Sequence, residues 1–266
     1  MKTSQDIWIV LAILTGVVVM MWAIHRSSIL KARNSEAIFD AFKAHNYAQV
    51  IALLNSGVDP NSSVTPDYER RTPREFFEDL FGKLREETPD RLYILNLACL
   101  YCSLEVCQAL LERGADANRA SRIGVTPLCS AVVGMERPDS PDGIKIIELL
   151  LKYHAKVNGV GKYRSLALPS AAGKGSEYVT KLLIDNGADV NKIGLGGLSS
   201  LYNAADGGHL SIVKMLLDAG ADPTLPTTHG KLPVNAARYR RNPEIVAMLE
   251  DAMAKRKAAA TGGPKK

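Results

Sequence analysis

The sequence predicts an all-α protein, in which a stack of about six helix-turn-helix units follows one transmembrane helix. A five-residue phrase recurs along the chain, and its last three copies, 154–158, 187–191 and 220–224, are spaced 33 residues apart. A fixed period of this length is typical of stacked copies of one helical unit. Residues 7–24 form a run of 18 residues without a charge, which is long enough to cross a bilayer.

The clearest unit lies between the phrases Gly-Ala-Asp-Val-Asn at 187–191 and Gly-Ala-Asp-Pro-Thr at 220–224. A short first helix is expected at 198–205, a turn at 207–209 and a second helix at 210–219. The apolar residues of that second helix recur on one face, as in an amphipathic helix. The glycine that opens the next phrase supplies the left-handed residue that ends a helix.

Four landmarks make the repeat recognisable, the first of them in the third unit and the others in the fifth. Thr-Pro-Leu-Cys at 126–129 opens a helix, because Thr is a good cap and Pro suits the first helical position. An Ala pair at 204–205, a Gly-His turn at 208–209 and Gly-Ala-Asp at 220–222 complete the set. Together they resemble the ankyrin repeat, over about residues 35–252. The resemblance implies a solenoid that binds proteins.

The other copies are more diverged. The first spans 36–61 and the second 91–118. In the fourth, 165–191, Pro169 falls inside the expected first helix and should distort it, because proline lacks the N–H that the helix needs. The last, 230–253, carries the charged outer residues that a terminal repeat requires.

Two insertions interrupt the period. The phrases at 57 and 114 are 57 residues apart, 24 more than one repeat. The excess, about 62–90, contains a capping box and predicts an extra amphipathic helix over about 73–87. Its Phe76, Phe77 and Phe81 either pack on the repeats or dock a partner or membrane, and both interpretations stay open. The second insertion, 137–143, is rich in Pro and Asp and predicts an exposed loop.

The uncharged run at 7–24 follows a short flank, 1–6. As a helix it would reach about 27 Å, close to one hydrocarbon thickness. Trp8 and Trp22 lie near its two ends, where amphipathic rings prefer the membrane interface. A cleaved signal peptide usually has a shorter apolar core and a small-residue cleavage site, so we favour an uncleaved anchor.

Flanking bases predict the orientation of this anchor. The juxtamembrane linker, 25–34, contains Arg26, Lys31 and Arg33, whereas Lys2 lies on the other side. Because positive flanks stay in the cytoplasm, the repeats are expected at the cytoplasmic face of the cell (inner) membrane. The alternative is a periplasmic or secreted protein released by cleavage.

The formal net charge of +5 comes from the end of the chain, since residues 255–266 contain five Lys or Arg and no acid. The tail at 253–266 is rich in Ala, Gly and Lys and is predicted to be disordered. Nucleic-acid binding is not expected, because no basic stripe with interleaved aromatics appears.

The four cysteines are Cys99, Cys102, Cys107 and Cys129. Cys99 and Cys102 have metal-ligand spacing, but Cys99 and Cys107 occupy core positions of the repeat, which favours buried thiols over a metal or a disulfide. No phosphate-binding loop, nucleophile elbow or His-Glu metal motif appears. We therefore expect no enzyme activity, no catalytic residue, no metal and no cofactor.

The ankyrin resemblance places partner contacts on the finger tips and on the exposed side of the first helices. We therefore expect a protein partner of a membrane-tethered scaffold, adaptor or inhibitor; the alternative is a structural subunit of a membrane complex. On the fingers the expected contact residues are Arg122, Ile123, Val125, Lys162, Tyr163, Leu195, Leu198, His229 and Lys231. On the first helices they are Leu100, Tyr101, Val133, Lys174, Asp206, Tyr239 and Arg240.

Overall fold

The computed structural model describes residues 34–64, 92–121, 124–159, 166–194 and 197–261. The chain divides into two compact parts, 1–91 and 92–266, which are treated separately below. Among the described residues, no helix combines the length and apolar character needed to span a bilayer. The anchor expected at 7–24 and the extra helix expected at 73–87, with Phe76, Phe77 and Phe81, lie outside these residues.

The first part contains one helix pair within its described residues. Residues 34–43 are helical, α2 spans Tyr47–Asn55, and a two-residue strand, β1, follows at Ser63–Val64. Asn46 caps α2 because its side chain accepts a hydrogen bond from the backbone N–H of Gln49, at 3.2 Å. Ser35 Oγ donates to the carbonyl of Ser63, at 3.1 Å, and ties the two ends of this segment together.

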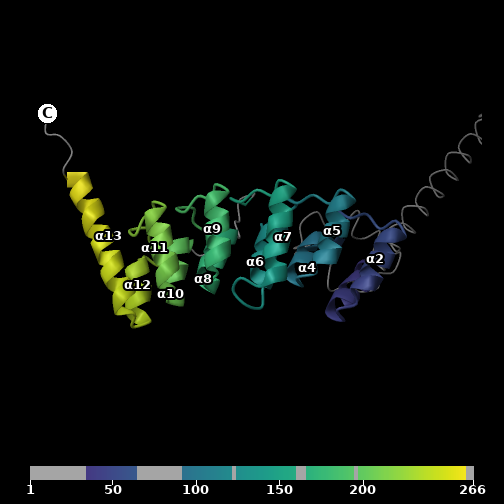
Figure 1. Ribbon diagram of the computed structural model, residues 1–266, viewed down its shortest axis with the longest axis horizontal. Helices are drawn as coiled ribbons and strands as arrows, with labels where there is room; N and C mark the ends of the chain where they lie inside the picture. Colours follow the sequence, from purple (N-terminus) through teal and green to yellow (C-terminus); the bar gives the residue numbers. More distant parts are fainter. Residues whose placement is uncertain (1–33, 65–91, 122–123, 160–165, 195–196, 262–266) are drawn as a thin grey trace, which may run out of the picture. The chain divides into compact units, whose positions relative to one another are not determined.

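The second part begins with strand β2, Leu92–Tyr93, and continues as five helix pairs in chain order (Figure 1). The first helices pack in sequence on one another, and among the second helices α5 packs on α7, α9 on α11 and α11 on α13. This arrangement confirms the predicted all-helical stack. The first helices are α4 (Ile94–Leu100), α6 (Pro127–Gly134), α8 (Ala167–Lys174), α10 (Ser200–Gly207) and α12 (Pro233–Tyr239). The second helices are α5 (Leu104–Glu112), α7 (Pro141–Lys152), α9 (Glu177–Asp185), α11 (Leu210–Asp218) and α13 (Pro243–Thr261).

One fully buried leucine per unit, here called a spine leucine, recurs along the core. Each second helix of the second part buries such a leucine completely, and burying a leucine side chain contributes about 2 kcal/mol. Small pairs on the first helices, such as Ala171-Ala172 and Ala204-Ala205, are also fully buried and let neighbouring helices approach closely. The spine leucines are Leu110, Leu150, Leu183, Leu216 and Leu249.

Pro169 does not distort its helix as predicted. Helix α8 begins at Ala167, so Pro169 is its third residue. The first N–H groups of a helix have no partner within the helix, and the missing N–H of proline therefore removes no hydrogen bond. The first helix of the fourth unit is intact, and Pro169 is buried in it.

The insertion at 137–143 is only partly the exposed loop that was predicted. Residues 141–143 already form the first turn of α7, which begins at Pro141. Asp139 is held in the loop by contacts with the next unit. Its Oδ1 accepts from Ser176 Oγ and from Val179 N (3.3 Å), and its Oδ2 accepts from Tyr178 N (3.3 Å). The carboxylate thus caps the first turn of α9, where the helix dipole favours a negative charge.

The prediction of a disordered tail at 253–266 is wrong for residues 253–261, which continue α13. Alanine, lysine, arginine and methionine are good helix formers, and eight of these nine residues are of these types. Lys255 pairs with Asp251 four residues earlier, at 2.7 Å. Arg256 reaches Asp222 in the preceding phrase, also at 2.7 Å, so the extension is held against the stack.

Candidate functional site

The recurring phrase forms a ladder of hydrogen bonds between neighbouring units of the second part. The Asn that ends one phrase bridges two backbone groups of the next phrase. Its Nδ2 donates to the backbone carbonyl of the first residue of the next phrase: Asn118 to His154 (3.1 Å), Asn158 to Gly187 (2.9 Å) and Asn191 to Gly220 (3.1 Å). Its Oδ1 accepts a hydrogen bond from the backbone N–H of the third residue of the next phrase, which is Lys156 (2.6 Å), Asp189 (2.8 Å) or Asp222 (2.7 Å).

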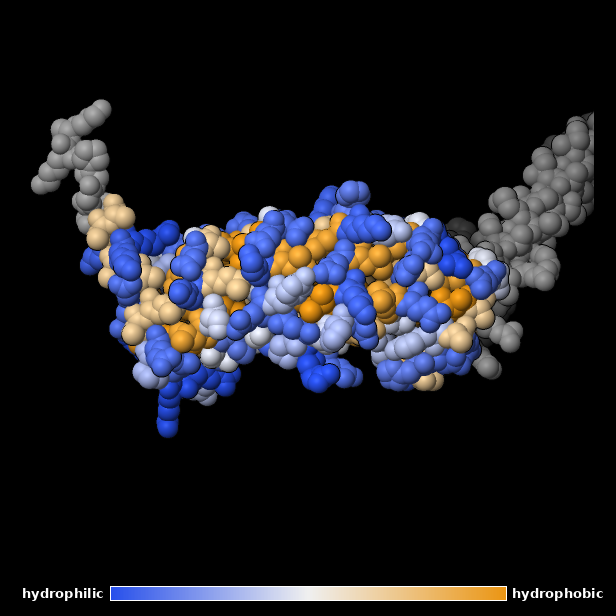
Figure 2. Space-filling view, in the orientation of Figure 1, coloured by the Kyte–Doolittle hydropathy of each residue, from blue (hydrophilic) through white to orange (hydrophobic). Residues whose placement is uncertain are grey.

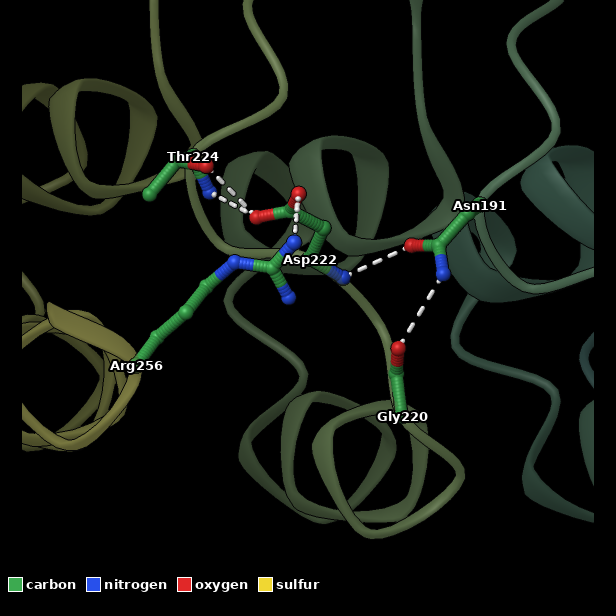
Figure 3. Close-up of polar contacts among 5 residues, drawn as sticks. All are labelled: Asn191, Gly220, Asp222, Thr224 and Arg256. Carbon is green, nitrogen blue, oxygen red and sulfur yellow. Dashed lines mark hydrogen bonds and ion pairs between the residues drawn. The ribbon is translucent and has the colours of Figure 1, made fainter. Parts of the chain in front are cut away.

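The last rung differs from the others (Figure 3). Thr224 stands where earlier phrases have Asn, and its N–H and Oγ1 both donate to Asp222 Oδ1, at 2.9 and 2.6 Å. The guanidinium of Arg256 approaches Asp222 Oδ2 at 2.7 Å. Burial favours a higher pKa for Asp222, but the hydrogen bonds from Thr224 and the charge of Arg256 outweigh it, so the pKa is lowered. The last phrase is therefore bound by an ion pair from Arg256 of α13 to Asp222, instead of by an Asn to a following phrase.

Each rung fixes the start of a finger, the segment that runs from one phrase to the next first helix. Among the described residues, the fingers and the first helices that follow them occupy 119–121 and 124–135, 159 and 166–175, 192–194 and 197–208, and 225–241. We call these residues, with the first helix α4 and the Tyr101 that follows it, the finger-and-first-helix surface. Figure 2 shows one face of the stack, on which apolar and polar side chains alternate along its length.

The expected contact residues near the ends of the first helices have different exposures. At one repeated position, Val133 is 46% and Tyr239 is 81% exposed, whereas Leu100 and Asp206 are half-buried. At the following position lie Tyr101, Lys174 and Arg240, of which the first two are half-buried and the third is exposed. This surface thus offers a large aromatic side chain at its C-terminal end and an aliphatic one in the third unit.

Three of the expected contact residues, Asp206, Arg240 and Lys174, are already bound within the stack. Arg240 donates through Nε and Nη2 to the two carboxylate oxygens of Asp206, at 3.1 and 2.9 Å. This hydrogen bond to Asp206 raises the pKa of Arg240, which stays charged. Lys174 Nζ donates to the carbonyl of Met135, at 2.9 Å. Arg240 and Lys174 therefore also connect neighbouring units.

The finger tips are described only in part. Arg122, Ile123, Lys162, Tyr163 and Leu195 lie outside the described residues. Of the remaining expected residues, Leu198 is 36% exposed, His229 and Lys231 are exposed, and Val125 is half-buried. The described tips thus combine an aliphatic side chain with basic or polar ones.

Charges of both signs lie on and beside this surface. Asp116 and Asp189 are exposed at the third position of their phrases, where the phrase at 154–158 has the exposed Lys156. On the surface itself, Asp206 pairs with Arg240. The basic residues of the described surface are Arg119, Lys174, Lys192, Lys231, Arg238, Arg240 and Arg241.

Three of the four cysteines lie in the core. Cys99, Cys107 and Cys129 are buried and Cys102 is half-buried, and none of the four forms a disulfide. Cys99 Sγ lies 3.7 Å from Cys107 Sγ, and burial together with this contact raises the pKa of Cys99 well above its ordinary value. In the part of the chain that the structure describes, no three His, Cys, Asp or Glu side chains are grouped to hold a metal ion.

Comparison with known families agrees with this geometry. A model described as three copies of the ankyrin repeat matches residues 139–227 and 168–256, and a single-repeat model matches 90–119. The chain contains ankyrin repeats. A comparison with curated proteins finds no match. Ankyrin repeats are typically non-enzymatic modules for protein–protein interaction, and the repeats of this chain support an interaction module.

Two further surface residues of the ankyrin stack were not among those expected. Ile193 is 40% exposed and lies two residues beyond the phrase that ends at Asn191. Arg119 is exposed directly after the phrase that ends at Asn118, with its guanidinium 4.8 Å from the centre of the Tyr93 ring. Numbering each residue by its distance from the phrase would have found both.

Proposed function

We propose that this protein is a membrane-tethered interaction module that binds a protein partner through its finger-and-first-helix surface. The observation that carries the proposal is the exposure of Val133, Leu198 and Tyr239 at the edge of helices that are otherwise packed into the stack. Aromatic side chains and arginine dominate binding energy at protein interfaces, and Tyr239 with Arg240 supplies both.

The architecture supports a macromolecular partner. An ankyrin stack presents an extended surface made from several units rather than an enclosed pocket. The inter-unit ladder holds the base of each finger in a fixed position, so little conformational entropy is lost when a partner binds. A scaffold, adaptor or inhibitor uses such a surface in the same way.

The tether is part of the proposal. Residues 7–24 are uncharged, end in tryptophans and precede Arg26, Lys31 and Arg33. These features support an uncleaved anchor with the ankyrin stack in the cytoplasm, at the inner face of the cell membrane.

Partner capture by surface variants tests the binding site. Full-length protein in neutral detergent is used to isolate bound proteins, which are quantified by mass spectrometry. Val133→Ala with Tyr239→Ala should reduce recovery of the specific partner at least tenfold without lowering the melting temperature. Tyr153→Ala with Tyr178→Ala, which removes the exposed tyrosines at the C-cap of α7 and on α9, is the matched control. Equal loss in both double variants would contradict the proposed surface.

Fractionation and protease protection test the tether. The full chain with a C-terminal epitope should remain with membranes after a high-salt wash and should keep its mass. In intact spheroplasts the epitope should resist added protease, and it should be digested after lysis. Digestion in intact spheroplasts would contradict the cytoplasmic orientation, and a shortened soluble product would contradict the anchor.

A further inference from the structure

The last helix pair of the second part exposes positions that the earlier pairs of this part bury. Helices α12 and α13 pack on α10 and α11, and no described helix follows α13 (Figure 1). Each first helix contains a fully buried Ala, and the residue after this Ala is also fully buried in α4, α6, α8 and α10. In α12 the same position is Arg238, which is exposed. The four buried residues are Cys99, Val132, Ala172 and Ala205.

The second helices show the same change. The residue three positions before the spine leucine is fully buried in α5, α7, α9 and α11, whereas Val246 of α13 is half-buried. The residue after the spine leucine is Leu or Ile in those four helices and the exposed Glu250 in α13. We call the surface formed by Arg238, Val246 and Glu250 the end face. The four buried residues before the spine leucines are Cys107, Ile147, Thr180 and Val213.

The end face contains a hollow of about 610 Å³, which lies where α12 meets α13. Pro243, Val246 and Ala247 form its apolar lining. Beside them, Arg238 Nη2 donates to Glu250 Oε1 at 2.5 Å, and both of these side chains remain at least half exposed. The end face thus combines an uncovered apolar hollow with an ion pair that faces solvent.

The charges of the end face do not suit a further repeat. Another repeat would cover Arg238 and Glu250 at positions where the earlier units have small or apolar side chains, and burial of charged groups is costly unless each is paired. A surface that covers the hollow must therefore offer an acid to Arg238 and a base to Glu250. A second copy offers both, because a two-fold axis that brings Arg238 of one copy to Glu250 of the other also makes the reciprocal contact.

The ion pair within one chain is compatible with a second contact. Arg238 donates to Glu250 from one nitrogen, whereas a guanidinium carries five N–H donors, so a second carboxylate can bind to the same side chain. Arg241 also lines the hollow and is exposed, and it provides a further donor to a carboxylate of a second copy.

We infer that a second copy of this chain docks on the end face around a two-fold axis, so that the protein self-associates through its last unit. Arg238 of each copy pairs with Glu250 of the other, and the apolar side chains around Val246 cover the hollow of the opposite copy. This contact continues the packing of the stack, in which each first helix is covered by the next. The inference does not depend on the proposed function, because it concerns two copies of the chain rather than another protein.

Energy transfer between two labelled populations tests self-association. Full-length protein in neutral detergent carries a donor or an acceptor fluorophore on a C-terminal tag. The wild-type chains should give a transfer signal that rises with protein concentration and is lost when unlabelled wild type is added in excess. Arg238→Glu and Glu250→Arg, tested separately, should each raise the dissociation constant at least tenfold, because like charges then meet across the two-fold axis.

A mixture of the two variants gives the sharpest comparison. In a mixed pair, one copy presents two acids and the other presents two bases, so both charge contacts across the axis are restored. Donor-labelled Arg238→Glu with acceptor-labelled Glu250→Arg should therefore bind within about threefold of the wild type, although neither variant binds itself. Both variants lose the same ion pair within the chain, so a purely internal role of this pair cannot produce the recovery.

A matched control changes charges elsewhere. Lys181→Glu and Asp185→Lys, tested separately, break an exposed ion pair of α9, at 3.0 Å, and should leave energy transfer unchanged. Thermal melting followed by circular dichroism checks that all variants fold.

Three results would overturn the inference: a monomeric wild type, unchanged transfer in both end-face variants, or no recovery in their mixture. If the wild type is monomeric and both end-face variants lose a captured protein, the end face belongs to that protein instead. The effect of Val133→Ala with Tyr239→Ala on partner capture is measured independently, so the proposed function and this inference can fail separately.

Discussion

The third and fifth units reach the same fold with different residues. The phrase that ends the fifth unit begins with Gly220, at φ 87°, whereas the one that ends the third begins with His154, at φ 60°. The third position of the phrase is Asp222 in the fifth unit and Lys156 in the third, yet both backbone N–H groups donate to the preceding Asn, at 2.7 and 2.6 Å. The ladder therefore depends on the Asn and the backbone, and tolerates a different side chain at the third position.

The two units also differ in how closely their first helices approach a neighbour. Gly134 ends α6, and Gly207 occupies the same position in α10. A Cβ added at Gly134 would lie 2.2 Å from the backbone oxygen of Leu100, whereas one at Gly207 would lie 2.5 Å from the ring of His209. A backbone group can move away only by shifting a helix, but an imidazole ring can rotate.

The largest predicted effect comes from this position. Gly134→Ala should lower the free energy of unfolding by about 3 kcal/mol, because α4 and α6 must separate to admit the methyl group. Gly207→Ala should cost less, about 1–2 kcal/mol, because the His209 ring can turn but loses its hydrogen bond to the carbonyl of Gly173, while alanine favours the helix. Urea unfolding of the two variants measures the difference. Equal losses would show that the second and third units have room to adjust.

Removal of a ladder Asn should have the next largest effect. Asn118→Ala and Asn191→Ala each lose one hydrogen bond to a carbonyl and one from an N–H, so each should cost about 1–2 kcal/mol. The two costs should be equal, because Lys156 and Asp222 contribute through the same backbone group. A clearly smaller cost for Asn118→Ala, measured in the same urea titration, would show that the Asp side chain matters to the rung.

The loop of the third unit gives the third prediction. Asp139→Ala removes the carboxylate that caps α9 and should cost about 1 kcal/mol. Asp139→Asn keeps one acceptor oxygen and tolerates the left-handed backbone at φ 55°, so it should cost less than half as much. Thermal unfolding compares the two variants. No change in Asp139→Ala would mean that the loop does not stabilise the fourth unit.

The smallest effect lies at the end of the ladder. The pKa of Asp222 is lowered in the folded protein, so its ionised form stabilises the fold above its unfolded pKa of about 3.9 and loses this effect as pH falls through the folded value. Arg256→Ala should therefore cost about 0.5 kcal/mol at pH 7, discounted because the Arg side chain is 55% exposed. This cost should disappear near pH 2–3. A constant cost across this range would assign the effect to helix packing instead.

The parts that sequence predicted well are those set by the period. The repeated landmarks located the helix pairs because Thr126, Pro127 and the core leucines act within one unit or between adjacent units. Contacts made by residues outside the repeated landmarks were not accessible in this way. Asp139 caps a helix of the next unit and Arg256 reaches back to Asp222, and neither contact has a fixed spacing in the repeat.

The candidate surface also combines features that the sequence predicted with features that it did not. The ankyrin resemblance located the expected contact residues along the chain but did not predict how exposed their side chains are. Val125 and Leu100 are half-buried, whereas Tyr239 is 81% exposed. The pairing of Arg240 with Asp206 depends on the approach of two units and has no local sequence signal.

Site-specific photocrosslinking tests most directly whether the finger-and-first-helix surface binds the partner. A photoreactive phenylalanine analogue replaces Tyr239 on this surface or Tyr178, 49% exposed, on the second-helix side. The full chain is irradiated in cells that contain its natural partners, and the products are identified by mass spectrometry. Crosslinking of a specific protein from position 239 and not from position 178 is the predicted result. Crosslinking from position 178 alone would contradict the proposed binding surface.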